Sequence, residues 1–105
     1  MKAMRDAWGE KLVELGHSDP RTVVLDGDLG NSTKADKFAK AHPDRFFQMG
    51  IAEQNLATVA AGMARAGKIP FTSSYAAFSP GRNWEQIKTT ACLNELPVMT
   101  VGSHA

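Results

Sequence analysis

The segment RFFQMGIAEQNLATVAAGMARAGKIPFTS, Arg45 to Ser73, decides the predicted fold because it places one candidate helix between two candidate strands. Arg45–Met49 and Ile69–Ser73 are short apolar runs bounded by turn-forming residues, as is typical of strands. Ala52–Ala66 lies between them and has apolar residues at helical spacing. These residues are Leu56, Val59, Ala60 and Met63. A strand, a helix and a strand in succession predict two parallel strands with the helix packed on one face.

The sequence before this segment continues the alternation of helix and strand. Ala3–Leu15 has the pattern of an amphipathic helix, which Gly16 is expected to end. Thr22–Leu25 is β-branched and apolar, and it predicts a buried strand that runs into the loop DGDLGNS. Either Ser32 or Thr33 is then expected to cap a second helix.

The second helix is expected to run through Ala41, and the chain after Ser73 predicts one more helix and one more strand. The helix is Trp84–Leu93, and the fourth strand is Pro97–Val101. Three side chains of this helix are expected to turn partly inward, namely Trp84, Ile87 and Cys92. Because the last strand ends without a closing helix, residues 1–105 predict a single partial α/β domain, a parallel sheet with helices on both faces.

Composition narrows the classes of partner. The 105 residues include 12 lysines and arginines against 11 aspartates and glutamates, with no long run of one sign, so neither nucleic acid nor an anionic membrane is indicated. A single cysteine, Cys92, cannot form an internal disulfide, and no apolar run is long enough for a membrane span. A cytoplasmic protein that binds small molecules and other chains is the expectation.

The polar residues of interest all follow predicted strands. Ligands of parallel sheets gather at the carboxyl ends of the strands, where loops and helix amino termini converge. The residues at that edge are Asp26, Asp28, Gly50–Glu53, Ser73–Phe78, Ser103 and His104. The edge is therefore the predicted site.

Glu53 can be interpreted in two ways. Spacing alone favours an ordinary glutamate in the first turn of a helix, where the helix dipole stabilises it by about 0.3–1 kcal/mol. The alternative is a buried carboxyl group that hydrogen-bonds a ring nitrogen.

Tyr75 and Phe78, three residues apart, also allow two interpretations. Their rings either pack in the core or form one aromatic wall of a ligand site.

Other familiar sites are not indicated. The loop DGDLGN lacks the spacing of phosphate-binding glycine loops, so Asp26 and Asp28 are interpreted as loop hydrogen-bonding groups. His42, Cys92 and His104 do not have metal-ligand spacing, and no nucleophile motif is present.

Several segments together resemble the pyrimidine-binding domain of transketolase, especially its split, two-subunit form. They are RDAWGEKL, LDGDLGNS, PDRFFQMGIAEQNLATVAAGMARAGKIPF, SSYAAFSPGRNWEQIK and LPVMTVGSHA. The resemblance implies a thiamine diphosphate-binding fold and a transferase of the pentose phosphate pathway, which moves a two-carbon ketol unit between sugar phosphates. It also implies that Glu53 is catalytic, since this glutamate hydrogen-bonds the aminopyrimidine ring of the cofactor and activates it.

The same resemblance assigns further residues. Tyr75 and Phe78 are implied to pack around the aminopyrimidine, whereas Gly81 stands where the family often has a larger side chain, with Arg82 as the alternative. Asp28 is implied to line the cofactor and substrate channel. Three other residues are implied to bind the substrate phosphate, namely Arg5, Ser32 and His104.

The resemblance also implies a partner. A subunit with the diphosphate-binding domain would hold the cofactor's diphosphate through Mg²⁺ or Ca²⁺, in a homodimeric or heterotetrameric assembly. The chain is therefore expected to be truncated, with no metal ligand of its own, and inactive alone. Two alternatives remain open, which are a deoxyxylulose phosphate synthase-like domain and a non-catalytic association module whose exposed sheet edge binds another chain.

Overall fold

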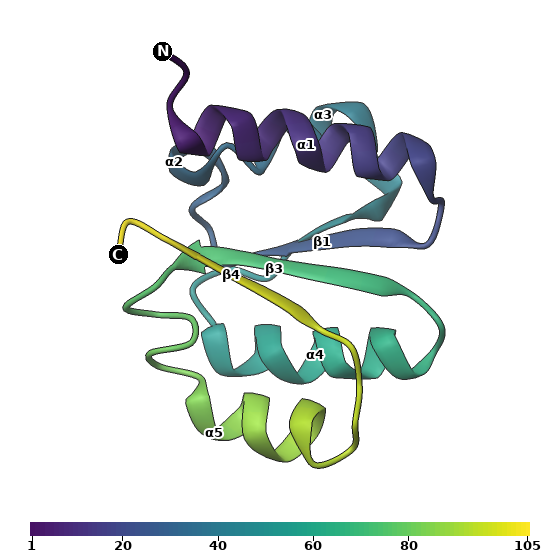
Figure 1. Cartoon of the computed structure of the whole chain (residues 1–105). Helices are drawn as coiled ribbons and strands as arrows, with labels where there is room; N and C mark the ends of the chain where they lie inside the picture. Colours follow the sequence, from purple (N-terminus) through teal and green to yellow (C-terminus); the bar gives the residue numbers. More distant parts are fainter.

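The computed structural model describes residues 1–105, which form a four-stranded parallel sheet between two layers of helices (Figure 1). The strands are β1 (Thr22–Asp26), β2 (Phe46–Gln48), β3 (Ile69–Tyr75) and β4 (Met99–Ser103), in the spatial order β2-β1-β3-β4. The helices are α1 (Met4–Ser18), α2 (Gly30–Thr33), α3 (Asp36–Ala41), the 3₁₀ turn η1 (Pro43–Arg45), α4 (Glu53–Arg65), α5 (Trp84–Gln86) and the π-helix η2 (Ile87–Cys92). The predicted α/β class, with helices on both faces, is confirmed.

Each face of the sheet has its own apolar core, because successive residues of β1 point to opposite faces. Val24 packs with α1 and α3 in a cluster completed by Leu12, Ala35 and Phe38. Val23 and Leu25 pack on the other face, where the partners from α4 are Leu56 and Ala60. Figure 1 shows the same division, with α1, α2 and α3 above the sheet and α4 and α5 below it.

The prediction that Gly16 ends the first helix is wrong, since α1 continues to Ser18. Gly16 is buried within α1, and a Cβ atom there would lie 2.6 Å from the ring of His42 and 2.8 Å from that of Phe38. The glycine is therefore required by close packing of α1 on α3 and the residue after it, and not by a turn.

The prediction of one capped helix after the first loop is also wrong. The segment forms two short helices, α2 and α3, separated at Lys34, whose φ is 69°. Neither Ser32 nor Thr33 caps a helix. The hydroxyl of Thr33 instead donates to the carbonyl of Leu29 within its own turn at 3.0 Å and accepts a hydrogen bond from the Ser73 hydroxyl at 3.2 Å, which ties α2 to β3.

The predicted helix Trp84–Leu93 exists, and Ile87 is half-buried as predicted, but Trp84 and Cys92 do not turn inward. Trp84 is 67% exposed and Cys92 is exposed, whereas Ala91 is buried. From Ile87 onward the turn is a π-helix, in which each hydrogen bond spans five residues. The wider turn moves the buried position away from the one that regular helical spacing predicts.

The two strands nearest the carboxyl terminus end later than expected. β4 begins at Met99 because Pro97 has no N–H to donate to a ladder, and it pairs with β3 as far as Tyr75 opposite Ser103. β3 is extended by the same pairing. Tyr75 and His104 are brought side by side at the carboxyl edge as a result.

Candidate functional site

Glu53 is the buried acidic residue at the start of α4. Gly50, three residues before it, adopts a φ of 73°, which turns the chain from β2 towards the helix. The Glu53 residue is only 3% exposed, and its Oε1 accepts a hydrogen bond from Nη1 of Arg82 at 2.9 Å. A surface glutamate in a first helical turn needs no such burial, so the ordinary explanation by the helix dipole is insufficient.

A continuous row of side chains leads from Glu53 to the end of β4. The guanidinium of Arg82 lies 4.7 Å from the centre of the Phe78 ring, which stacks on Tyr75 with centroids 6.0 Å apart and planes 15° apart. Tyr75 in turn lies 4.1 Å, centroid to centroid, from His104. The predicted residues Glu53, Tyr75, Phe78 and His104 are thus gathered at one edge of the sheet.

The backbone of Glu53 is held separately from its carboxylate. Nδ2 of the buried Asn83 donates to the Glu53 carbonyl at 2.9 Å and to the Ser79 hydroxyl at 3.1 Å. A buried amide with two acceptors fixes the positions of both partners. The first turn of α4 is therefore tied to the segment that follows β3.

Gly27 and Ser74 lie beside the Glu53 carboxylate. A Cβ atom at Gly27 would lie 3.8 Å from Glu53 Oε2 and 3.3 Å from Ser74 Oγ. The Ser74 hydroxyl is buried and has no hydrogen-bond partner. Buried polar atoms are usually paired, so an unpaired hydroxyl beside a carboxylate is a place where a ligand can supply the missing partner.

The two aspartates of the first loop have different surroundings. Asp26 is buried, and its Oδ2 accepts hydrogen bonds from the Gly30 N–H and the Gln48 side-chain amide, both at 3.0 Å. Burial raises the pKa of the Asp26 carboxyl, although these hydrogen bonds oppose the rise. The prediction that Asp26 is a loop hydrogen-bonding group is confirmed. Asp28 is exposed, with a φ of 68°, at the same edge.

Arg5 and His104 line one cavity of about 550 Å³ between the start of α1 and the end of β4. Trp8, Thr33 and Ser103 also line it. Ser32 does not line this cavity, but its carbonyl accepts a hydrogen bond of 3.4 Å from Nη1 of Arg5. The three residues predicted to hold a phosphate therefore converge on one region, with the Ser32 carbonyl, and not its hydroxyl, in contact with Arg5.

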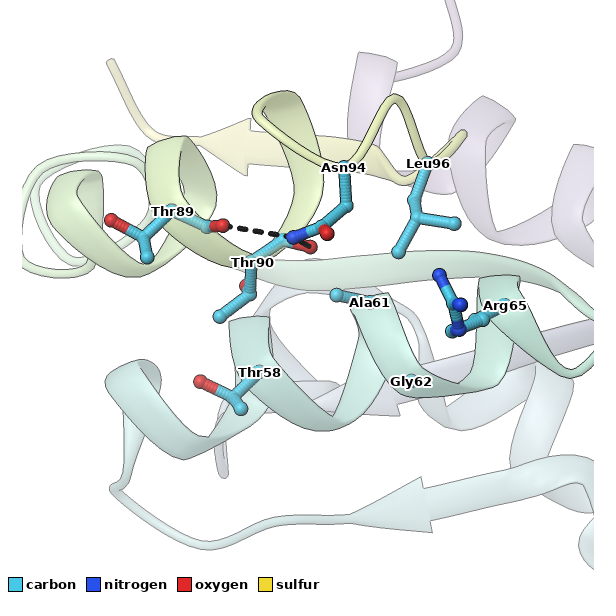
Figure 2. Close-up of a pocket in the computed structure, with 8 residues that line it drawn as sticks. All are labelled: Thr58, Ala61, Gly62, Arg65, Thr89, Thr90, Asn94 and Leu96. Atoms are coloured by element: carbon cyan, nitrogen blue, oxygen red, sulfur yellow. Dashed lines mark hydrogen bonds between the residues drawn. The ribbon is translucent and has the colours of Figure 1, made fainter.

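A second cavity, of about 470 Å³, lies between α4 and η2 and contains none of the predicted site residues (Figure 2). It is lined by Thr58, Ala61, Gly62, Arg65, Thr89, Thr90, Asn94 and Leu96. Within this lining, Asn94 donates to the carbonyls of Thr89 and Thr90. The close approach of α4 and η2 here follows from the small residues of α4, of which Ala57, Ala60 and Ala61 are buried.

The sequence did not single out several residues of the site. Asn83, Ser74 and Gly27 carry no motif, and only their position after strand ends or beside Glu53 makes them candidates. Arg82 was named from the sequence as the alternative to Gly81, and the structure shows its N–H bonded to the Phe78 carbonyl at 3.0 Å. That turn returns its side chain over the aromatic ring.

The structure contains neither a cluster of metal ligands nor a helix suited to a membrane. No group of three or more histidine, cysteine, aspartate or glutamate side chains is arranged to hold a metal ion. No helix combines the length and the apolar character required to cross a bilayer.

Solved structures share this fold. A split-gene transketolase, whose description reads "inactive beta4 tetramer", superposes with a TM-score of 0.83 and 54% identity. The superposition covers 93% of this chain and 33% of that protein. Transketolase from Campylobacter jejuni superposes with a TM-score of 0.81 and 24% identity over 95% of this chain and 16% of its own, a similarity that concerns the fold alone.

Sequence comparison gives the same family. A putative transketolase C-terminal section from Methanocaldococcus jannaschii is 48% identical over 104 residues, which are 99% of this chain and 33% of that protein. Human transketolase is 44% identical over 103 residues, which are 97% of this chain and 16% of the human protein. The chain thus spans a third or less of these relatives. Residues 1–105 match the family described as transketolase, pyrimidine binding domain, and the chain belongs to that family.

Proposed function

We propose that this chain supplies the pyrimidine-binding half of a thiamine diphosphate site in a two-part transketolase that transfers a two-carbon ketol unit between sugar phosphates. The observation that carries the proposal is the buried carboxylate of Glu53 at the end of a row of aromatic rings. When bound, thiamine diphosphate supplies the chemistry that breaks and forms the carbon–carbon bond. The protein has to bind, orient and exchange protons with it.

The residues present fit an aminopyrimidine ring. Glu53 can hydrogen-bond a ring nitrogen through its carboxyl group, and the unpaired Ser74 hydroxyl offers a second polar contact nearby. Phe78 and Tyr75 provide flat apolar faces, which favour stacking of a planar ring. Gly27 keeps the intervening space free of a side chain. Asp28 is assigned to the wall of the same channel.

The cavity beside β4 fits the phosphate end of a sugar phosphate. Arg5 presents a guanidinium and His104 an imidazole to that cavity, and hydrogen bonds from charged donors to phosphate oxygens are about twice as strong as neutral ones. Ser32 is assigned to the same phosphate, since its carbonyl already contacts Arg5. The contact between the tilted rings of His104 and Tyr75 connects the phosphate end with the ring end of the site.

The proposal includes a partner subunit. The diphosphate of the cofactor and its Mg²⁺ or Ca²⁺ are assigned to a separate chain, in a dimeric or heterotetrameric assembly. The solved split-gene relative is described as an "inactive beta4 tetramer". An assembly of that one kind of subunit that is inactive supports the need for a second kind of subunit. Residues 1–105 are proposed to act in the cytoplasm as a partial domain without activity of their own.

Reconstitution tests this function. The chain and a subunit carrying the diphosphate-binding domain are combined, and ketol transfer between sugar phosphates is compared for wild type, Glu53→Ala and Glu53→Gln. Both substitutions are expected to remove most activity while light scattering shows unchanged assembly. Full activity of the Glu53→Ala complex would contradict the assigned role. Decarboxylation of pyruvate without ketol transfer would favour a deoxyxylulose phosphate synthase-like enzyme, and assembly without cofactor binding would favour a non-catalytic module.

A further inference from the structure

Arg82 makes two contacts of the kind that the proposed function assigns to the aminopyrimidine ring. Its guanidinium is planar and rich in N–H donors, it lies 4.7 Å from the centre of the Phe78 ring, and it donates to Glu53 Oε1 at 2.9 Å. If the aminopyrimidine ring stacks on Phe78 and hydrogen-bonds Glu53, it needs the space that the Arg82 guanidinium fills.

We propose that Arg82 is an internal occupant of the pyrimidine site, which seals Glu53 until the ring of the cofactor displaces the guanidinium. The inference rests on the proposed function and adds to it a residue that sets the affinity for the cofactor. In this role Arg82 takes no part in the reaction. It occupies the free site and moves away before the ring of the cofactor is in place.

Exposure shows why the guanidinium can leave. The Arg82 side chain is 53% exposed, whereas the Glu53 side chain is 3% exposed. Water and salt compete for the half-exposed cation, so the Arg82 guanidinium can exchange this contact for solvent. Its departure leaves the buried Glu53 carboxylate without its ion-pair partner, a cost that a hydrogen bond from the incoming ring offsets.

Release of Arg82 leaves Glu53 in place. The adjacent residue, Asn83, is buried and donates to the Glu53 carbonyl at 2.9 Å, and this bond does not involve the guanidinium. The backbone N–H of Arg82 bonds to the Phe78 carbonyl at 3.0 Å, which fixes the main chain while the side chain is free to move. A fixed main chain with a removable side chain distinguishes an occupant from a permanent support of Glu53.

Gly81 explains why the occupant is Arg82 and not the residue before it. A Cβ atom at Gly81 would lie 2.0 Å from the Ala77 carbonyl oxygen, so this backbone admits no side chain there. The position at which the family often has a larger residue is thus empty in this chain. Arg82 reaches across the same aromatic ring from the next position.

The test measures cofactor affinity in the reconstituted complex by isothermal titration with thiamine diphosphate. Removal of an internal competitor is expected to lower the dissociation constant about twofold to fivefold in Arg82→Gln. Arg82→Lys keeps the charge without the planar fork, and is expected to bind more tightly than wild type by a smaller factor. Arg21→Gln is the matched control, because it removes an ion pair with Asp19 at the opposite edge of the sheet, and its affinity should equal that of wild type.

The unfolding temperature of the free chain separates an occupant from a support. Arg82→Gln should gain cofactor affinity without any gain in unfolding temperature, since it loses an ion pair and forms no new contact. Equal or weaker binding by both Arg82 variants would overturn the inference while the proposed function stands. Absence of thiamine diphosphate binding in the wild-type complex would instead refute the proposed function, and this inference with it.

Discussion

Tyr75 and His104 lie with ring centroids 4.1 Å apart, which joins the end of β3 to the residue that follows β4. The contact exists because the β3–β4 ladder extends to Tyr75 opposite Ser103. Phe78 stacks on Tyr75, and Arg82 connects that ring with Glu53. One edge of the sheet thus carries both the buried Glu53 carboxylate and the His104 imidazole, which are the two ends of the proposed site.

Replacement of His104 tests the phosphate end. In the reconstituted complex, His104→Ala is expected to raise the KM for a sugar phosphate about 10-fold to 100-fold, since a charge-assisted hydrogen bond contributes about 1.5–3 kcal/mol. Steady-state kinetics should show a smaller change in kcat. His17→Ala, an exposed histidine at the other end of the sheet, is the control. An unchanged KM for His104→Ala would remove this residue from the phosphate site.

Gly27 tests the space in front of Glu53. Gly27→Val is expected to weaken binding of thiamine diphosphate about 10-fold to 100-fold, because the added methyl groups crowd Ser74 Oγ and Glu53 Oε2. Titration calorimetry measures the loss. Gly62→Ala is the control, since a Cβ there meets nothing within 4 Å, and it should stabilise α4 by about 0.5–1 kcal/mol without changing affinity. Equal affinity of Gly27→Val and wild type would show that the ring lies elsewhere.

Asn83 tests how firmly the first turn of α4 is held. Asn83→Ala should lower the free energy of unfolding by about 1–3 kcal/mol, because the Glu53 carbonyl and the Ser79 hydroxyl lose a buried donor. Asn94→Ala also removes an amide with two acceptors, but at an exposed position, and should cost about 0.5 kcal/mol or less. Urea denaturation of both variants measures the two losses in the free energy of unfolding. Equal losses would mean that burial of Asn83 adds nothing.

Asp26 predicts a pH dependence of stability. Burial raises the pKa of this carboxyl above its ordinary value of 3.8, so the folded chain holds the proton more tightly than the unfolded chain. Stability from this group is present at low pH and is lost as pH rises through the raised pKa. Asp26→Asn does not titrate, so its unfolding temperature relative to wild type should improve from pH 4 to pH 7.

The control for Asp26 is Asp44→Asn, which removes one carboxylate from the exposed surface. Thermal unfolding of the three proteins at several pH values provides the comparison. A constant difference between Asp26→Asn and wild type, after subtraction of the surface control, would show that Asp26 titrates alike in the folded and unfolded chains.

Sequence patterns predicted the elements better than their ends. The strand and helix in Ala52–Ser73 appear nearly as predicted, since strong periodicity and the glycine at Gly67, with a φ of 94°, mark the turn between them. In the helix after Phe78, the predicted inward position was right for Ile87 and wrong for Trp84 and Cys92. The residues from Ile87 to Cys92 form a π-helix. Neither their types nor their spacing in the sequence distinguishes a π-helix from an α-helix.

The candidate site divides in the same way. Glu53 and the pair Tyr75 and Phe78 were predicted from their place after strands and from family resemblance. Arg82 was named only as an alternative to Gly81 and Ser74 only as part of the segment Ser73–Phe78, and their contacts made them specific candidates. Asn83 became a candidate through its contacts alone. The Arg82–Glu53 pair spans 29 residues of sequence, and no periodic pattern reports a contact across that separation.

The sequence by itself determined the alternation of strands and helices, and with it the edge at which polar residues gather, because hydrophobic periodicity is a local property of the chain. It also determined the family, through motifs distributed over all 105 residues. Only the tertiary structure decided that Gly16 serves packing and that Arg82 is the cation on Glu53. Both depend on distances between elements, which are set by how the two helical layers pack on the sheet.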